Sequence, residues 1–301
     1  MLKDKIGKSL ALDPDYIEII SKRNNKYTRY YIDKKSGGKR EILHPSKELK
    51  VLQRWLVYNI FNNFQESEFS YAYSKGDSIR KNALAHKQSK YILHSDIKNY
   101  FPSIKREMLS HFFDSNTEIV RSLRLSEADI NLIMDICLYR GECLVVGSVA
   151  SPKIANLIMR DFDNELFTQI SHKGTFEYTR YADDITISSG EYIPEELVNI
   201  IRKTLEKFGF CMNEHKTYFS SKKRRRQVTG VVIDNNDEII SIGNKKYKAF
   251  QRNLYEFLIK EKGDASYLRG YLSYIKSINK NQYLQLKRTY EQYDKEGKIF
   301  Y

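Results

Sequence analysis

Two adjacent carboxylates inside an alternating apolar stretch constrain the local fold more than any other feature of this chain. The stretch reads Thr179-Arg-Tyr-Ala-Asp-Asp-Ile-Thr-Ile-Ser188, and its alternation predicts a β-hairpin with Asp183 and Asp184 at the tip. Two like charges held this close repel each other, so one of them takes up a proton unless divalent cations neutralise the pair. Taken alone, such a pair is more often a solvated turn, and a metal site is the alternative.

A third carboxylate favours the metal site. The stretch from Tyr91 to Ile97 predicts a short buried strand that carries Asp96 near its end and is followed by the aromatic pair Tyr100 and Phe101. Three carboxylates on neighbouring strands can hold two Mg²⁺ ions, or Mn²⁺ ions, through oxygen ligands, while waters and nucleotide phosphates fill the remaining positions. Such an ion pair activates a primer hydroxyl and stabilises the departing pyrophosphate. The residues therefore predict two-metal nucleotidyl transfer.

The charge of the chain agrees with a nucleic-acid partner. The formal net charge is +13 over 301 residues, which favours a polyanionic partner over acidic or neutral ones. Residues 245–301 carry 13 Lys and Arg against 6 Asp and Glu, together with nine tyrosines. Cations among aromatic rings suit phosphate neutralisation and base stacking. Amphipathic helices that pack these tyrosines into a core are the alternative.

Cysteine usage and hydropathy bear on the compartment. Cys137, Cys143 and Cys211 form no Cys-x-x-Cys pair, which argues against structural zinc and against a disulfide framework. The sequence contains no run of 18 or more apolar residues. We expect a reduced, cytoplasmic protein that does not enter the membrane.

Further elements are predicted around the acid-bearing strands. Residues 29–45 contain two extended stretches separated by a Lys-Lys-Ser-Gly-Gly-Lys turn, which is typical of a β-hairpin. Ser46 can cap a following helix, and a later helix begins with Pro194 in its first turn and stops at Gly209. Each helix has one apolar face, made by Leu52, Leu56, Ile60 and Phe64 in the first and by Leu197, Ile201, Leu205 and Phe208 in the second. With helices from about 105 to 165 between the acid-bearing strands, the expected fold class is α+β.

These motifs, in this order, resemble the reverse transcriptases. The resemblance implies that Asp96 and the Ile97 carbonyl are metal ligands together with Asp183 and Asp184, and that Phe101 is the aromatic gate against a ribose 2′-OH. Gly147-Ser-Val-Ala-Ser151-Pro152-Lys-Ile-Ala-Asn156 is similar to the motif that contacts nucleotide and template, and Tyr181 opens the second metal motif. In the motif that follows, Lys216 takes the place of a proton donor to pyrophosphate.

Two more elements resemble the bacterial retron reverse transcriptases in particular. Asn82-Ala83-Leu-Ala-His86 is similar to the retron Asn-Ala-x-x-His element, and Val228-Thr229-Gly230 is similar to the retron Val-Thr-Gly element. Both imply nucleic-acid contact. One departure concerns Leu144-Val145-Val146-Gly147, where many reverse transcriptases have Leu-Pro-x-Gly. Gly147 still allows close approach of the backbone to a nucleotide.

The resemblance also implies a right-hand polymerase with fingers, palm and thumb. We expect an N-terminal extension and fingers over 1–90, and a palm with an antiparallel sheet over 91–235 that includes a finger-like helical insertion at about 105–150. A small helical, RNA-binding thumb is expected over 236–301. Arg40, with Lys39 and Lys35, resembles the triphosphate-binding position. The basic run Lys222-Lys-Arg-Arg-Arg226 is usually a solvated loop, but beside the Val228 strand it is expected to contact nucleic-acid phosphates through Lys222, Arg224 and Arg225.

The activity implied by the resemblance is RNA-directed DNA synthesis. The chain would copy its own structured noncoding RNA, with dNTPs, into a branched multicopy single-stranded DNA, and would act in antiphage defence with an accessory effector protein. Group II intron-like and abortive-infection reverse transcriptases are alternatives, and so is a catalytically silent RNA-binding scaffold. The three carboxylates argue against the scaffold, which has no need of them.

Overall fold

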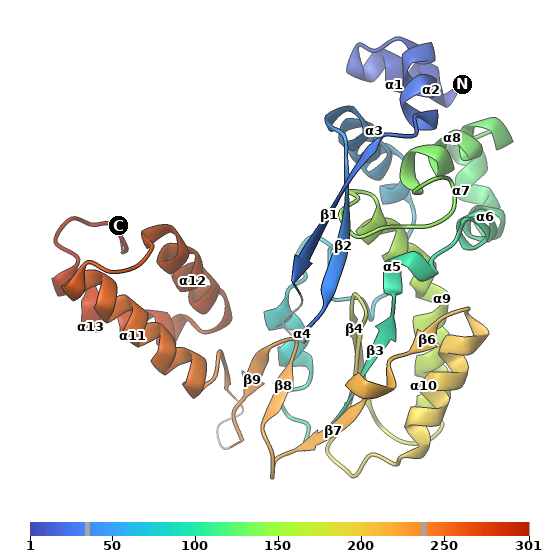
Figure 1. Cartoon of the computed structure of the whole chain (residues 1–301). Helices are drawn as coiled ribbons and strands as arrows, with labels where there is room; N and C mark the ends of the chain where they lie inside the picture. The colour runs from blue at the N-terminus through green and yellow to red at the C-terminus, as the bar shows by residue number, and fades with distance from the viewer. Residues whose placement is uncertain (34–36, 236–238, 301) are drawn as a thin grey trace.

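An antiparallel sheet lies at the centre of the computed structural model, which describes residues 1–33, 37–235 and 239–300 (Figure 1). Its strand order is β4 (Glu177–Tyr181), β5 (Asp184–Ser189), β3 (Tyr91–Lys98) and β6 (Cys211–Met212), and β7 (Tyr218–Ser221) also pairs with β3. The register places Asp96 opposite Asp184, and it places His94 opposite both Thr186 and Tyr218. The predicted hairpin and the predicted strand with Asp96 are therefore confirmed as neighbours in one sheet.

Two long helices cover one face of this sheet. They are α9 (Ser151–Ser171) and α10 (Glu196–Lys207), which lie beside the strands in Figure 1. The first core, beneath these helices, includes four residues of the two central strands: Leu93 and Ile97 of β3, and Ile185 and Ile187 of β5. The apolar face predicted for the second helix is confirmed at Leu197, Ile201 and Leu205. This helix begins at Glu196, and Pro194 precedes it, with its carbonyl oxygen accepting a hydrogen bond from the Leu197 amide.

The fingers combine a long hairpin with helices. Strands β1 (Tyr27–Asp33) and β2 (Lys39–Pro45) pair antiparallel, and α3 (Lys47–Asn59) follows, with the Ser46 hydroxyl accepting from the Leu49 amide at 3.2 Å. The four apolar residues predicted for this helix are all buried, although Ile60 and Phe64 come after its last residue. Lys35 lies outside the described residues. The short helix α5 (Tyr100–Ser103) follows β3, and the range of the expected helical insertion contains α6 (Arg106–Ser115), α7 (Thr117–Ser122) and α8 (Glu127–Cys137).

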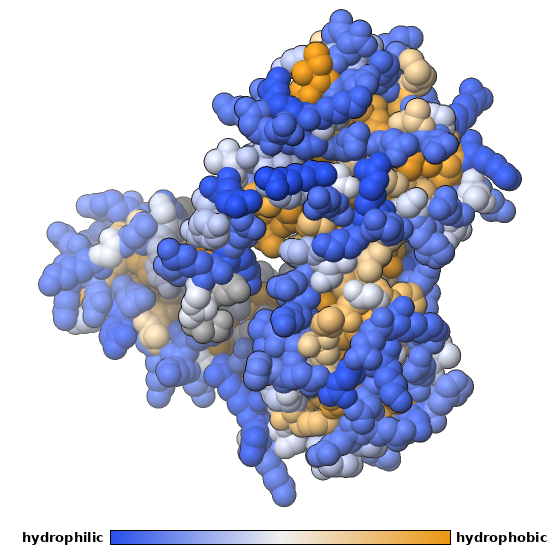
Figure 2. Space-filling view, turned by 45° about the vertical axis from the view of Figure 1, so that its right-hand side comes forward, coloured by the Kyte–Doolittle hydropathy of each residue, from blue (hydrophilic) through white to orange (hydrophobic). Residues whose placement is uncertain are grey.

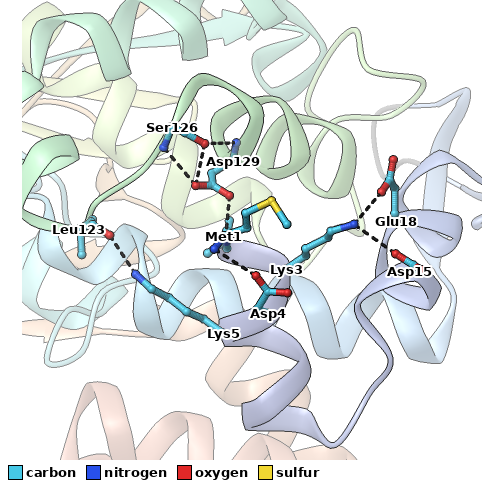
Figure 3. A network of polar contacts seen from close by, with 10 residues as sticks. Met1, Lys3, Asp4, Lys5, Asp15, Glu18, Leu123, Ser126 and Asp129 are labelled. Atoms are coloured by element: carbon cyan, nitrogen blue, oxygen red, sulfur yellow. Dashed lines mark hydrogen bonds and ion pairs between the residues drawn. The ribbon is translucent and has the colours of Figure 1, made fainter.

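The N-terminal helices α1 (Leu2–Leu10) and α2 (Pro14–Lys22) bury apolar residues in the first core, and α1 also makes polar contacts with the fingers (Figure 3). The Leu2 amide donates to the Asp129 carboxylate at 2.6 Å, and the same carboxylate closes a capping box with Ser126 at the start of α8. Lys5 donates to the Leu123 carbonyl at 3.2 Å. One carboxylate thus both caps α8 and orients the first helix of the chain.

A second core holds the C-terminal part together. A three-stranded sheet of β8 (Arg226–Val228), β9 (Val231–Ile233) and β10 (Ile240–Ser241) is followed by α11 (Asn244–Lys260), α12 (Ala265–Ile278) and α13 (Lys280–Tyr290). Their apolar residues pack with Ala83 of α4 (Ile79–Ala85) and with Ile92 of β3. Figure 2 shows this lobe set apart from the body by a notch. The expected helical thumb is present, and α4 and Ile92 tie it to the palm.

The expected fold class, α+β, is confirmed by this arrangement. The boundaries between the three parts stay a prediction, because α4, which precedes residue 91, shares its core with the C-terminal lobe. Within 1–33, 37–235 and 239–300, no helix has both the length and the apolar character needed to cross a membrane.

Candidate active site

The hairpin between β4 and β5 brings two carboxylates to the tip of the palm sheet. Ala182 has a left-handed backbone with φ of 57°, so the chain turns sharply before Asp183. The Ile97 amide donates to the Asp183 carbonyl at 2.9 Å, while Asp184 pairs with Asp96 in the register. The three predicted carboxylates are thereby gathered at one end of adjacent strands.

The electrostatics at this tip indicate an excess of negative charge. Partial removal from water and the charge of Asp96 raise the pKa of Asp183. Partial removal from water, with the charges of Asp183 and Asp96, raises the pKa of Asp184 to about 7. Lys216 acts in the opposite direction on both groups, and Arg40 does so on Asp183. Further cationic charge at this site would therefore be favourable.

Asp96 already has two nitrogen partners. Its Oδ2 accepts from Lys216 Nζ at 2.6 Å and its Oδ1 from Asn213 Nδ2 at 2.9 Å. The Asn213 amide also donates to the Asp96 carbonyl at 2.8 Å. Lys216 lies on the short η2 (Glu214–Lys216), and its side chain is 55% exposed against 5% for Asp96. An exposed cation thus covers a buried carboxylate.

The donor set fits hard divalent cations. Three carboxylates offer only oxygen ligands, which is the preference of Mg²⁺ and Mn²⁺. In the part of the chain that the structure describes, no three acidic, His or Cys side chains are close enough to enclose a metal ion as they stand. Lys216 already occupies one oxygen of Asp96 in this arrangement.

A buried ion pair supports the hairpin from behind. Arg180 donates through Nε and Nη2 to the two Asp163 oxygens, both at 2.8 Å, and both side chains are fully buried. Arg180 also donates to the Ala182 carbonyl at 3.1 Å, and Tyr178 donates to Asp163 at 2.6 Å. These bonds fix the turn residue that precedes the two acids.

The fingers strand β2 approaches the site through Gly147. The Leu43 amide donates to the Val146 carbonyl at 2.9 Å, and Gly147 has φ of 108°. A Cβ at Gly147 would lie 2.7 Å from the Leu43 carbonyl oxygen. The close approach that this glycine permits is therefore to the backbone of β2, and its contact with a nucleotide stays a prediction. Arg40 lies on the same strand and is exposed, as is Lys39.

The aromatic pair after Asp96, Tyr100 and Phe101, lies beside Tyr73, a residue that the sequence did not single out. Phe101 is half-buried, with its ring centroid 5.2 Å from that of Tyr100 and 6.4 Å from that of Tyr73. Tyr73 has φ of 68°, and partial burial with the charge of Asp183 raises its pKa to about 12. Tyr73 thus belongs to the site. Its local sequence carries no motif, and its backbone conformation could not be read from the residue type.

Four residues predicted to contact nucleic acid have no surface for it. Asn82, His86 and Val228 are 0% exposed and Ser151 is 1% exposed. His86 hydrogen-bonds Ser188 and Thr179 across the sheet, both at 2.7 Å, and Ser151 accepts from the Val145 amide. These four assignments to direct contact are corrected to structural roles, because each side chain is enclosed by protein. Pro152, Tyr181, Thr229 and Gly230 remain half-exposed.

The two retron-like elements touch each other. Asn82 Nδ2 donates to the Thr229 hydroxyl at 3.3 Å. Thr229 and Gly230 both have positive φ, at 45° and 84°, and form the turn between β8 and β9. Two short motifs separated by almost half of the chain therefore contact each other, and both contribute residues to the second core.

The basic run 222–226 divides into two parts. Arg226 is fully buried and donates to the carbonyls of Lys87, Ser89 and Asp234. The expectation that the whole run is a solvated loop is therefore wrong for Arg226. Arg224 and Arg225 are exposed, and Lys222 is half-exposed. Contact with nucleic acid stays a prediction for these three.

The tyrosines of the C-terminal lobe divide in the same way. Five pack against the second core, namely Tyr247, Tyr271, Tyr274, Tyr283 and Tyr290. Three are exposed, namely Tyr255, Tyr267 and Tyr293. The packed tyrosines fit the expected core role, and the exposed ones are free to stack on bases as the other alternative requires.

The comparisons agree with this geometry. The family model "Reverse transcriptase (RNA-dependent DNA polymerase)" matches residues 32–233. The telomerase of Candida albicans, solved in complex with a fragment of telomeric RNA, superposes with a TM-score of 0.54 at 13% identity, over 91% of this chain and 55% of that one. This chain spans about half the length of that telomerase chain, and the likeness concerns the fold alone. Fold and site together define a reverse transcriptase, an RNA-dependent DNA polymerase.

Curated relatives narrow the family. The Retron Ec86 reverse transcriptase of Escherichia coli is 30% identical over 87% of this chain and 79% of the relative. The Retron Ec73 reverse transcriptase of the same organism is 32% identical over 88% and 87%, respectively. The chain belongs to the retron reverse transcriptases. Polymerases of this class typically depend on metal ions and act on an RNA template with nucleotides.

Proposed function

We propose that this chain reverse transcribes a cognate structured noncoding RNA into a branched, multicopy single-stranded DNA by two-metal nucleotidyl transfer. The observation that carries the chemistry is the gathering of Asp96, Asp183 and Asp184 at one end of the palm sheet, with the pKa of both hairpin acids raised. A site that lacks positive charge in this way favours cation binding. The noncoding RNA and the branched product are supported by the retron family to which the chain belongs.

The three carboxylates and the Ile97 carbonyl are the proposed ligands of two Mg²⁺ ions. When bound, such ions lower the pKa of the attacking hydroxyl and neutralise charge on the transferred phosphate. Lys216 is proposed to leave Asp96 and to donate a proton to the departing pyrophosphate. Its present position, 2.6 Å from Asp96, puts the ammonium group within the same site.

The fingers supply the proposed contacts with the incoming nucleotide. Arg40, with Lys39, is proposed to bind the triphosphate, since it is exposed on β2 and its charge partly opposes the rise in the pKa of Asp183. Phe101 is proposed as the gate against a 2′-OH, because its half-buried ring follows the Asp96 strand directly. Arg224 and Arg225 are proposed to bind RNA phosphates, together with Lys222 and the exposed tyrosines of the C-terminal lobe.

Antiphage defence with an accessory effector protein is part of the same proposal. Its support is family membership, and the effector would be encoded outside this chain.

The first experiment expresses the chain with its flanking genomic segment and extracts nucleic acid. We expect a short single-stranded DNA whose size shifts after RNase treatment and after debranching. If that DNA is absent while primer extension is seen on an added RNA template, the proposed polymerase activity is kept and the proposed branched product is rejected.

A second experiment isolates the chemistry. Asp183→Asn with Asp184→Asn should abolish DNA synthesis and leave RNA binding intact, because the substitution removes metal-binding charge with little change of shape. Unchanged DNA synthesis in this variant would contradict the proposed site.

A further inference from the structure

A row of side chains lies next to the catalytic carboxylates on the face of the palm sheet that carries Asp96. Successive residues of a strand alternate between faces, so His94 lies on the same face as Asp96. The register adds Thr186 of β5 and Tyr218 of β7, each opposite His94. The family motifs do not include Tyr218.

Tyr218 and His94 form a stacked pair. Their ring centroids are 4.5 Å apart and their planes differ by 25°. His94 is 9% exposed and Tyr218 is 53% exposed, and the His94 ring also hydrogen-bonds Ser220 at 3.2 Å. The buried His94 ring thus supports one side of Tyr218, while much of the Tyr218 surface faces solvent.

The position of Tyr218 relates it to the growing strand. It lies level with His94, two residues along the sheet from Asp96, which is about 6.6–6.8 Å on a β-strand. Consecutive nucleotides of one strand rise by about 3.4 Å. A strand that ends at Asp96 and runs along this face would bring the one or two nucleotides before its end over Tyr218. Next to burial, the charge of Asp184 contributes to the raised pKa of Tyr218, which indicates that the phenol lies within range of the catalytic site.

We propose that Tyr218, supported by His94, is a positioning residue that packs against the sugars of the nucleotides just behind the 3′ end of the growing DNA strand. The inference rests on the proposed polymerase function and deepens it. In a duplex the faces of the bases are covered by their neighbours, whereas the sugars line the outside. An apolar ring on the floor of the site therefore meets sugar C–H groups, and the contact is independent of sequence and carries no charge.

The test uses a defined primer and RNA template, and it measures both equilibrium binding of a dideoxy-terminated primer and steady-state extension. Tyr218→Ala should weaken primer–template binding by about tenfold, within the range of aromatic contacts with nucleic acid. The KM for dNTP and the salt dependence of binding should stay unchanged, because no phosphate contact is lost. Tyr218→Phe should retain wild-type binding, since the ring remains.

Tyr192→Ala is the matched control. Tyr192 is 68% exposed and lies after the far end of β5, against Tyr91. This variant should bind primer–template like the wild type. Wild-type binding by Tyr218→Ala would overturn the inference while leaving the polymerase intact, and so would equal losses in Tyr218→Ala and Tyr192→Ala. Absence of extension by the wild-type protein would overturn the proposed function and this inference together.

Discussion

Arg180 and Asp163 form a bidentate ion pair with no exposed surface on either side chain, and this pair holds the turn on which the catalytic acids are carried. Breaking one partner of a buried pair leaves the other charge without compensation, which costs about 3–5 kcal/mol.

Asp163→Asn should therefore lower the free energy of unfolding by about 3 kcal/mol or more, measured by urea denaturation. Asp161→Asn, on the same helix, is the control, because Asp161 is 61% exposed. Surface ion pairs contribute about 0–1 kcal/mol. Equal stability of the two variants would show that the buried pair does not support the hairpin.

Lys216→Ala should have opposite effects on metal binding and on turnover. Removal of the ammonium group frees the Asp96 oxygen, so half-maximal activity should need less Mg²⁺. If Lys216 is the proton donor, kcat should fall by about 100-fold. Metal titrations of primer extension give both quantities. Lys207→Ala is a control, since Lys207 is 60% exposed and pairs with Glu165. If Lys216→Ala needed as much Mg²⁺ as the wild type for half-maximal activity, or more, Lys216 would not compete with the metal for Asp96.

Gly147→Ala should disturb the contact between the fingers and the palm. The new Cβ would lie 2.7 Å from the Leu43 carbonyl oxygen at a φ of 108°, and such overpacking costs about 1–3 kcal/mol. Because Arg40 lies on the same strand, the KM for dNTP should rise as well. Gly190→Ala meets nothing within 4 Å and should behave like the wild type. Thermal denaturation and dNTP titration test both effects, and normal behaviour of Gly147→Ala would exclude the contact.

Acid should destabilise the protein through His86. Burial lowers the pKa of this histidine to about 3, whereas the unfolded value is about 6.5. Below that value the unfolded chain binds a proton that the folded chain does not, so stability falls as the pH decreases. The resulting loss of unfolding free energy amounts to about 2 kcal/mol between pH 7 and pH 5. Urea midpoints across this range should show a smaller loss for His86→Gln than for the wild type, while the exposed His111→Gln should follow the wild type.

Arg224 and Arg226 should separate RNA binding from stability. Arg224→Ala is expected to weaken binding to every RNA alike and to reduce the salt slope by about one, as loss of a phosphate contact does. Arg226→Ala should instead lower the free energy of unfolding by about 3 kcal/mol, because several buried carbonyls lose their donor. Filter binding at several salt concentrations and urea denaturation make the distinction. An Arg226→Ala variant of normal stability would disprove the structural role.

The sequence predicted those parts of the fold that local pattern determines. Alternation identified the Asp183 hairpin, and a capping serine with four-residue spacing identified the helix after Ser46. Burial of polar residues was harder to predict. His86 and Arg226 look like exposed ligands in a one-dimensional motif, but tertiary packing encloses both and satisfies them with hydroxyls and carbonyls. Tyr73 was missed because its place depends on a left-handed backbone residue and on Phe101, neither of which its own segment specifies.

The hydrogen bond between Asn82 and Thr229 has a consequence for protein engineering. A chimera that moves the small sheet of β8 to β10 together with the C-terminal helices has to be cut before β8, and such a cut takes Asn82 from one parent and Thr229 from the other. Compatible crossovers would have to move both segments as a matched set, since a donor without its acceptor is buried at the joint. The two motifs therefore act as a single heritable module, although the chain encodes them 147 positions apart.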